Sequence, residues 1–154
     1  IITIEKILKV FKKKYFKLKI DKGIEKLSLK EHISNTKKLL INAVDLRLVS
    51  DVPISLNLSG GIDSGAICSI ASKILGKKLE TFSLIDSDDR YNESNLIKTT
   101  AHDCGVKNNL IKLDNNINFF DLLKKSIEYN NYPLFTLTDL IQYYLSSFIK
   151  KKRF

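Results

Sequence analysis

The stretch Leu58-Ser59-Gly60-Gly61-Ile62-Asp63-Ser64 decides the fold, because it joins a short apolar run to an amphipathic segment. Residues 52–58 are mostly apolar, and the apolar residues of 64–75 recur at helical spacing. A strand, a glycine loop and a helix are therefore expected in succession. Two adjacent glycines let the backbone approach an anion without an intervening Cβ, and they can adopt positive φ. Since a helix start adds free N–H groups and its dipole, the stretch predicts a phosphate-binding loop.

The polar residues of this loop are consistent with that prediction. Ser59 and Ser64 can donate hydrogen bonds from their hydroxyl groups to phosphate oxygens. The carboxylate of Asp63 would repel bare phosphate, so it requires a hard cation such as Mg²⁺ between the two. A Walker loop ends in Gly-Lys-Ser/Thr, whereas this loop ends in Ile62-Asp63-Ser64. The chain also contains no G-x-G-x-x-G motif. A nucleophile elbow centred on Ser59 needs glycine where the chain has Asn57.

The alternation of strands and helices continues along the chain. Further strands are predicted at 79–85 and 109–113, and helices at 29–48, 93–104, 119–129 and about 138–150. This order predicts an α/β fold with a parallel sheet and helices on both faces. Ligands of such sheets bind beyond the carboxyl ends of the strands, where the glycine loop lies. Residues 1–27 mix apolar residues with lysine and predict a short hairpin that turns at Gly23.

Composition and charge argue against a nucleic-acid-binding protein and against a membrane-spanning one. A chain of 154 residues suits one globular domain, or one domain with an appendage. The net charge is +9, but residues 1–38 hold 12 lysines against 4 acidic residues and 150–153 are all basic. Because the basic charge lies in the termini, a nucleic-acid partner is not expected. No apolar run approaches the roughly 18 residues of a membrane span, and a cytoplasmic location is expected.

The other candidate residues have structural interpretations. Cys68 and Cys104 are too few for a disulfide scaffold and are interpreted as small core residues. Both histidines lie in predicted amphipathic helices and are interpreted as surface or packing residues. The acidic residues within 86–89 follow the second strand and are interpreted as solvated, with metal binding as the alternative.

The glycine loop resembles that of a known superfamily. Residues 59–64 are similar to the S-G-G-x-D-S pyrophosphate loop of the N-type ATP pyrophosphatases, or PP-loop proteins. These include GMP synthetase, NAD synthetase, argininosuccinate synthetase, tRNA-lysidine synthetase and asparagine synthetase. The resemblance implies a Rossmann-like fold of the adenine nucleotide alpha hydrolase type.

The flanks of the loop narrow the resemblance to the glutamine-hydrolysing asparagine synthetases. Residues 43–53, A-V-D-L-R-L-V-S-D-V-P, resemble the A-V-x-x-R-L-x-S-D-V-P segment of that family. Residues 78–84 resemble its second strand, and Tyr91-Asn92-Glu93-Ser94 resembles its Y-D-E-S helix start. The resemblance is strongest from 39 to 105.

The resemblance also implies a domain arrangement. Residues 1–27 would form a linker or hairpin after a glutaminase-type domain, and residues 28–154 would form the N-terminal part of the synthetase domain. Because the chain contains no Met, it is interpreted as a fragment that begins after one domain and ends within the next. The fold is accordingly expected to be incomplete at the C-terminus. The glutaminase domain in cis is the implied partner, and a homodimer is left open.

The activity implied by the resemblance is an ATP-dependent amide ligation. The substrate carboxylate, that of aspartate or a related acid, would attack the α-phosphorus of ATP to give an acyl-adenylate and pyrophosphate. Ammonia released from glutamine would then displace AMP. The residues implied to bind ATP and its pyrophosphate are Leu58, Ser59, Gly60, Gly61, Asp63, Ser64 and Leu84. Of these, Leu58 and Leu84 would contact the adenosine and Asp63 the Mg²⁺, and no catalytic residue is assigned.

Departures from the family pattern leave other functions open. Asn57 stands where the family usually has a large apolar residue, and Ile85-Asp86 replaces the usual Gly-Phe. Asn131-Tyr132 replaces an acidic pair before Pro133, and the later S-G-D/E-G-x-D-E segment is absent from the chain. The alternatives are another PP-loop ATP pyrophosphatase, for example a tRNA-modifying one, and a truncated, non-catalytic nucleotide-binding remnant.

Overall fold

The computed structural model describes residues 2–4, 10–19, 23–86, 88, 90–113, 116–133 and 136–152. The chain divides into two compact units, Ile1–Lys37 and Lys38–Phe154. The first unit contains the strands β1 (Ile2–Ile4) and β2 (Val10–Lys12), which pair antiparallel, and a short 3₁₀ helix, η1 (Ile24–Lys26).

The hairpin of the first unit lies earlier in the chain than the sequence predicted. Its strands pair with Ile2 opposite Lys12, whereas Gly23 directly precedes η1 and joins no strands. Gly23 has φ −66°, an ordinary right-handed conformation, so the glycine provides none of the positive φ that a tight hairpin turn uses. Residues 20–22 of the predicted turn lie outside the described residues.

The helix α1 (Leu29–Arg47) confirms the predicted helix 29–48 and its capping box. The backbone N–H of Ser28 donates to Glu31 Oε2 at 2.8 Å, and the N–H of Glu31 donates to Ser28 Oγ at 3.4 Å. The hydrogen bonds from Ser28 hold the pKa of the Glu31 carboxyl below its ordinary value. Near the end of the helix, Val44 packs with Ile70 and Ala71. All three residues belong to the second unit.

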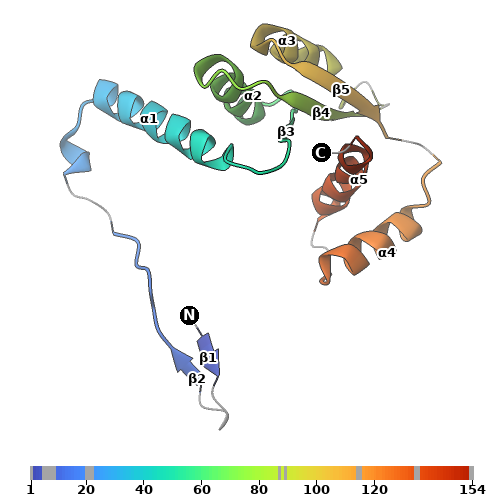
Figure 1. The fold of residues 1–154 in the computed structure, drawn as a ribbon, viewed down its shortest axis with the longest axis horizontal. Coiled ribbons are helices and arrows are strands. Elements are labelled where there is room, and N and C mark those ends of the chain that lie inside the picture. Colours follow the sequence, from blue (N-terminus) through green and yellow to red (C-terminus); the bar gives the residue numbers. More distant parts are fainter. Residues whose placement is uncertain are drawn as a thin grey trace. The chain divides into compact units, whose positions relative to one another are not determined.

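The second unit is built on a parallel sheet, which confirms the predicted α/β fold. Its strands are β3 (Ser55–Asn57), β4 (Glu80–Ile85) and β5 (Lys107–Lys112), in the spatial order β3-β4-β5 (Figure 1). The register places Asn57 opposite Phe82, and Phe82 opposite Asn109. The strand β3 is shorter than the predicted 52–58, since Pro53 has no N–H to donate to a ladder.

The helices of the second unit agree closely with the predicted segments. They are α2 (Ile62–Ser69), its π-helical continuation η2 (Ile70–Ile74), α3 (Ser94–Cys104), α4 (Phe119–Asn130) and α5 (Leu137–Lys151). Gly105 ends α3 with φ 64°, in the left-handed conformation that favours glycine, as the sequence predicted. No helix in the described ranges combines the length and the apolar character needed to cross a membrane.

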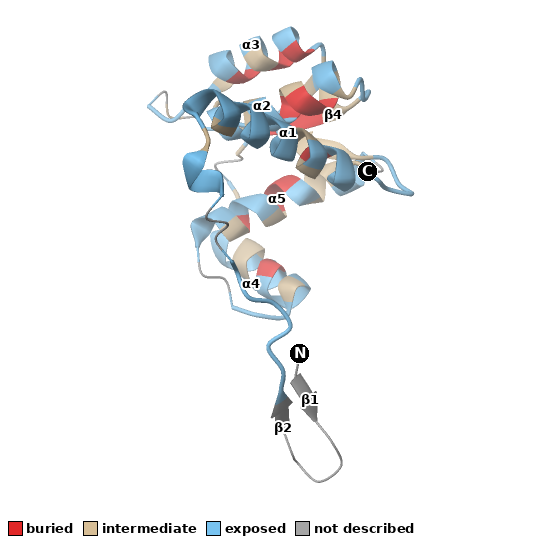
Figure 2. Cartoon of the chain, turned by 90° about the vertical axis from the view of Figure 1, so that its left-hand side faces the viewer, coloured by how far each residue is buried: buried red, intermediate tan, exposed pale blue. Residues whose placement is uncertain are grey.

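Helices cover both faces of this sheet, as predicted. Side chains alternate between the faces of a strand, so Ile85 and Phe82 of β4 point in opposite directions. On one face, Ile85 packs in a core with residues of the loop, α2 and α3: Leu58, Cys68, Ile97, Ala101 and Cys104. On the other face, Phe82 is 1% exposed and lines a cavity of about 360 Å³ together with Phe148 of α5. The buried residues accordingly concentrate on β4 and on these helices (Figure 2).

Candidate functional site

The glycine loop follows β3 directly and is anchored to the sheet at its first residue. The N–H of Leu58 donates to the carbonyl oxygen of Phe82 at 2.8 Å, and the Leu58 side chain is 2% exposed. Gly61 is the N-cap residue of α2, so the helix begins at Ile62. The loop therefore lies between the carboxyl end of β3 and the positive end of a helix, where an anion is favoured.

The two serines of the loop bind one another and the loop backbone. The hydroxyl oxygens of Ser59 and Ser64 are 2.8 Å apart, and Ser64 Oγ accepts from the N–H of Ser59 at 3.1 Å. The N–H of Gly61 donates to Ser59 Oγ at 3.3 Å. The structure thus brings Ser59 and Ser64 together, as predicted residues of one loop.

The loop glycines depart from one part of the prediction, the positive φ. The positive φ allowed in the sequence analysis is absent from both, and Gly61 has φ −76°. What Gly60 provides is space, because a Cβ built on it would lie 2.8 Å from the Cβ of Glu93. A Cβ on Gly61 would lie 3.3 Å from Ser59 Oγ, a tighter but adjustable contact.

The neighbour that Gly60 accommodates is a carboxylate. The N–H of Gly60 donates to Glu93 Oε2 at 2.9 Å, from the residue that precedes α3. This contact was not predicted from the sequence, although Glu93 is part of the stretch Tyr91-Asn92-Glu93-Ser94. An anionic oxygen therefore already accepts from a loop N–H, in the way expected for a phosphate oxygen.

Asp63 fits the role of a Mg²⁺ ligand only if other ligands come from elsewhere. It lies in the first turn of α2 and is exposed. Within the described ranges, no three His, Cys, Asp or Glu side chains gather in a way that could hold a metal. Mg²⁺ commonly uses one or two carboxylates, with phosphates and water as the other ligands, so the donor set here suits a metal that arrives with a polyphosphate.

The acidic residues after β4 that the structure describes make contacts with their near neighbours in the chain. Arg90 Nη2 lies 2.7 Å from Asp88 Oδ2, and hydrogen bonds from the Arg90 side chain hold the pKa of the Asp88 carboxyl below its ordinary value. Asp86 Oδ1 accepts from the N–H of Asp88 at 2.8 Å. Asp89 lies outside the described residues. These contacts agree with the interpretation of a solvated acidic loop.

The structure does not bring the side chains of Leu58 and Leu84 together. Leu58 packs beside Ile85 in the core, whereas Leu84, next to Ile85 in β4, points to the opposite face of the sheet. A ligand near the loop would meet Leu58 through its backbone. Their contact with adenosine stays a prediction.

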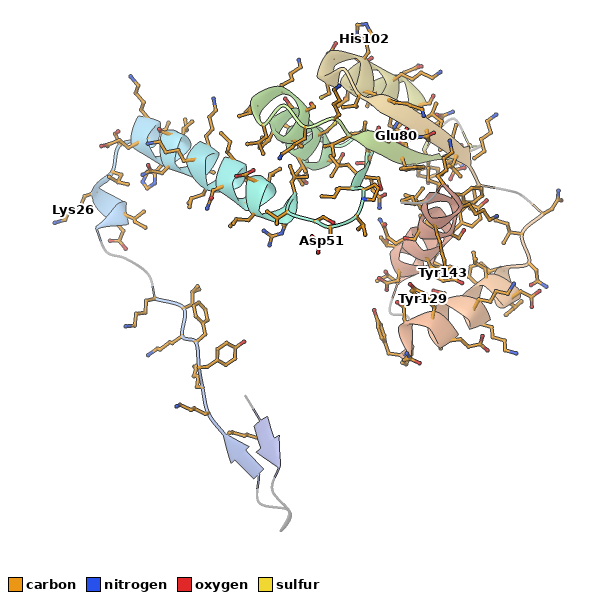
Figure 3. The ribbon with its side chains drawn as sticks, in the orientation of Figure 1. Lys26, Asp51, Glu80, His102, Tyr129 and Tyr143 are labelled. Atoms are coloured by element: carbon orange, nitrogen blue, oxygen red, sulfur yellow. The ribbon has the colours of Figure 1, made fainter. Side chains whose placement is uncertain are left out.

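The polar residue at the end of β3 has a partner in α5. Asn57 Nδ2 donates to Gln142 Oε1 at 2.9 Å. This hydrogen bond gives the polar side chain of Asn57 a partner at the end of the strand. At the next residue of α5, the ring of Tyr143 lies 5.7 Å from the ring of Tyr129 of α4 (Figure 3). These two tyrosines therefore contribute to the packing of α4 against α5.

Both cysteines lie in the core behind the loop, as predicted. Cys68 of α2 and Cys104 of α3 belong to the same buried cluster, and both are free thiols. Burial raises the pKa of the Cys68 thiol, with a further contribution from Cys104. The Cys68 thiol is therefore protonated at neutral pH, and both cysteines pack as small side chains in the core.

A parallel sheet whose strand β3 leads through a glycine loop into a helix defines an α/β protein of the Rossmann-like type. The chain belongs to the asparagine synthase family, which matches residues 35–154.

Curated relatives agree with this membership. The chain is 29% identical over 119 residues to asparagine synthetase [glutamine-hydrolyzing] 1 of Bacillus subtilis, covering 77% of this chain and 18% of the relative. It is 41% identical over 70 residues to putative asparagine synthetase [glutamine-hydrolyzing] 2 of Methanocaldococcus jannaschii, covering 45% and 13%. It is 33% identical over 101 residues to amidase chyE of Penicillium rubens, covering 56% and 15%. The matches thus span less than a fifth of the length of each relative.

Proposed function

We propose that this chain forms the ATP-binding part of an ATP-dependent amide ligase. The enzyme activates a carboxylate as an acyl-adenylate with release of pyrophosphate, and ammonia then displaces AMP to form the amide. The observation that carries the proposal is the loop N–H of Gly60, which already binds a carboxylate oxygen at the helix end where phosphate is expected. Membership of the asparagine synthase family supports the choice of reaction.

Each loop residue has a role in this reaction. The backbone of Gly60 and Gly61, with the hydroxyls of Ser59 and Ser64, binds the pyrophosphate portion of ATP and stabilises charge on the leaving group. Asp63 holds Mg²⁺, which neutralises phosphate charge when it is bound. The remaining proposed contacts, those with the adenosine, come from Leu58 through its backbone and from Leu84.

The substrate and the domain arrangement are proposed from the relatives. Two of them are named glutamine-hydrolysing asparagine synthetases, which favours aspartate as the acid and glutamine as the source of ammonia. The third is named an amidase, so a related acid is the competing substrate. We propose residues 1–27 as the linker from a glutaminase-type domain and 28–154 as the beginning of the synthetase domain, in a cytoplasmic enzyme.

ATP–pyrophosphate exchange on the full-length gene product tests this function. Aspartate should stimulate the exchange of labelled pyrophosphate into ATP if the acyl-adenylate forms reversibly. The absence of exchange with any amino acid, despite measurable ATP binding, would contradict the ligase and favour a non-catalytic remnant. Binding of ATP that depends on RNA and is lost at high salt would favour a tRNA-modifying PP-loop enzyme instead.

A further inference from the structure

The side chain of Glu93 lies directly on the part of the loop assigned to pyrophosphate. Its Oε2 accepts from the N–H of Gly60 at 2.9 Å. A Cβ built on Gly60 would lie 2.8 Å from the Cβ of Glu93 and 3.0 Å from its Cδ, so the carboxylate and its stem cover this glycine.

A carboxylate and a bare phosphate compete for this position. The N–H of Gly60 has one proton, so it cannot give a full hydrogen bond to Glu93 Oε2 and to a phosphate oxygen together. The two anions also repel one another at such short range. Any polyphosphate bound at the loop must therefore displace the Glu93 carboxylate or arrive with a cation that neutralises part of its own charge.

Glu93 can move without breaking the helix that it precedes. It is the N-cap residue of α3, but its side chain makes no capping hydrogen bond. The residue is exposed, so its carboxylate can rotate into solvent at low cost. Only the Cβ, which is held by the backbone, must stay beside Gly60.

We infer that Glu93 is a selectivity-determining residue, which excludes bare polyphosphate from the loop and admits its magnesium complex. The inference rests on the proposed function, because it assumes that the loop binds pyrophosphate. Magnesium removes two negative charges from the ligand, so the repulsion from Glu93 weakens most for the complex. Asp63 and Glu93 then have different roles. Asp63 binds the metal, whereas Glu93 weakens the binding of polyphosphate that carries no metal.

Calorimetric titration of inorganic pyrophosphate tests this inference, with excess Mg²⁺ and with EDTA. The proteins are the wild type, Glu93→Gln and the control Glu128→Gln, which removes one exposed carboxylate from α4. A charged acceptor is worth about 1 kcal/mol more than a neutral one, so Glu93→Gln should strengthen metal-free binding about fivefold. Binding with Mg²⁺ should change by less than about twofold, and Glu128→Gln should change neither affinity.

Two results would overturn the inference. A Glu93→Gln variant with an unchanged ratio of the two affinities would show that the carboxylate does not discriminate. A large loss of affinity only with Mg²⁺ would make Glu93 a metal ligand. If no variant binds pyrophosphate under any condition, the proposed function fails as well, whereas wild-type binding with an unchanged ratio refutes only the role of Glu93.

The chemical shift of the Gly60 amide proton gives a readout independent of any ligand. In the wild type this proton should resonate downfield, because it is bound to a carboxylate, and Glu93→Gln should move it upfield. An unchanged shift would show that the contact is absent in solution and would also overturn the inference.

Discussion

Alanine at Gly60 and alanine at Gly65 should change stability in opposite directions, although the two glycines are five residues apart. At Gly60 the new Cβ would lie 2.8 Å from Glu93 Cβ, 3.0 Å from its Cδ and 3.1 Å from its Oε2. The first of these atoms cannot be moved by side-chain rotation, so the loop or the start of α3 must shift. At Gly65, within α2, the nearest atom is Thr100 Cγ2 at 3.5 Å, an ordinary contact.

The magnitudes follow from these distances. Overpacking costs about 1–3 kcal/mol, and for a chain of this size 1 kcal/mol corresponds to about 2–4 °C in Tm. Gly60→Ala should therefore lower the Tm by about 2–12 °C. Alanine in a helix interior is favoured over glycine by about 1 kcal/mol, so Gly65→Ala should raise the Tm by about 2–4 °C. Thermal unfolding followed by far-UV circular dichroism measures both.

A third variant identifies the cause of the loss. Glu93→Gly removes all three crowded atoms and leaves an acceptable N-cap residue. Combined with Gly60→Ala in one protein, it should recover most of the stability that Gly60→Ala loses. A Gly60→Ala protein as stable as Gly65→Ala would show that Glu93 does not crowd Gly60. An equal loss from Gly60→Ala with and without the Glu93 side chain would show the same.

Three further variants test the site, the packing of α5 and the buried thiol. Asp63→Asn should lower the Mg²⁺-dependent affinity for ATP about tenfold without loss of the fold, while Asp45→Asn in α1 should leave the affinity unchanged; calorimetric titration measures both. Asn57→Ala should destabilise the protein by about 1 kcal/mol, with a coupling of about 0.5–1.5 kcal/mol to Gln142→Ala in a urea double-mutant cycle, because the two amides share a hydrogen bond. Since burial raises the pKa of Cys68, the unfolded thiol ionises first as the pH rises above about 8.5. Wild type should therefore lose stability relative to Cys68→Ala above that pH, by up to about 1.4 kcal/mol per pH unit in urea unfolding.

Each of these predictions has a clear contrary result. An unchanged affinity of Asp63→Asn would exclude the loop as the metal-dependent site. Additive losses for Asn57→Ala and Gln142→Ala would show that α5 does not contact the end of β3. A constant stability difference between wild type and Cys68→Ala from pH 8 to 10 would mean that the thiol is not protected from ionisation.

The order of the elements and the position of the loop follow from local patterns in the sequence. The strand, glycine loop and helix around 58–64, the capping box at Ser28 and the glycine stop at Gly105 all appear in the structure as predicted. These features depend on hydrophobic period and on hydrogen bonds between residues at most a few positions apart. The amino-terminal hairpin was misplaced, since Gly23 carries a strong turn preference but adopts an ordinary conformation.

The surroundings of the loop depend instead on tertiary packing. The contact of Gly60 with Glu93 joins residues 33 positions apart, and that of Asn57 with Gln142 joins residues 85 positions apart. Neither follows from local propensity, because both depend on how α3 and α5 pack against the sheet. The two glycines were recognised from the sequence as conformationally permissive residues, but it is the approach of a neighbouring carboxylate that makes Gly60 necessary, and this arises only when the helices are packed.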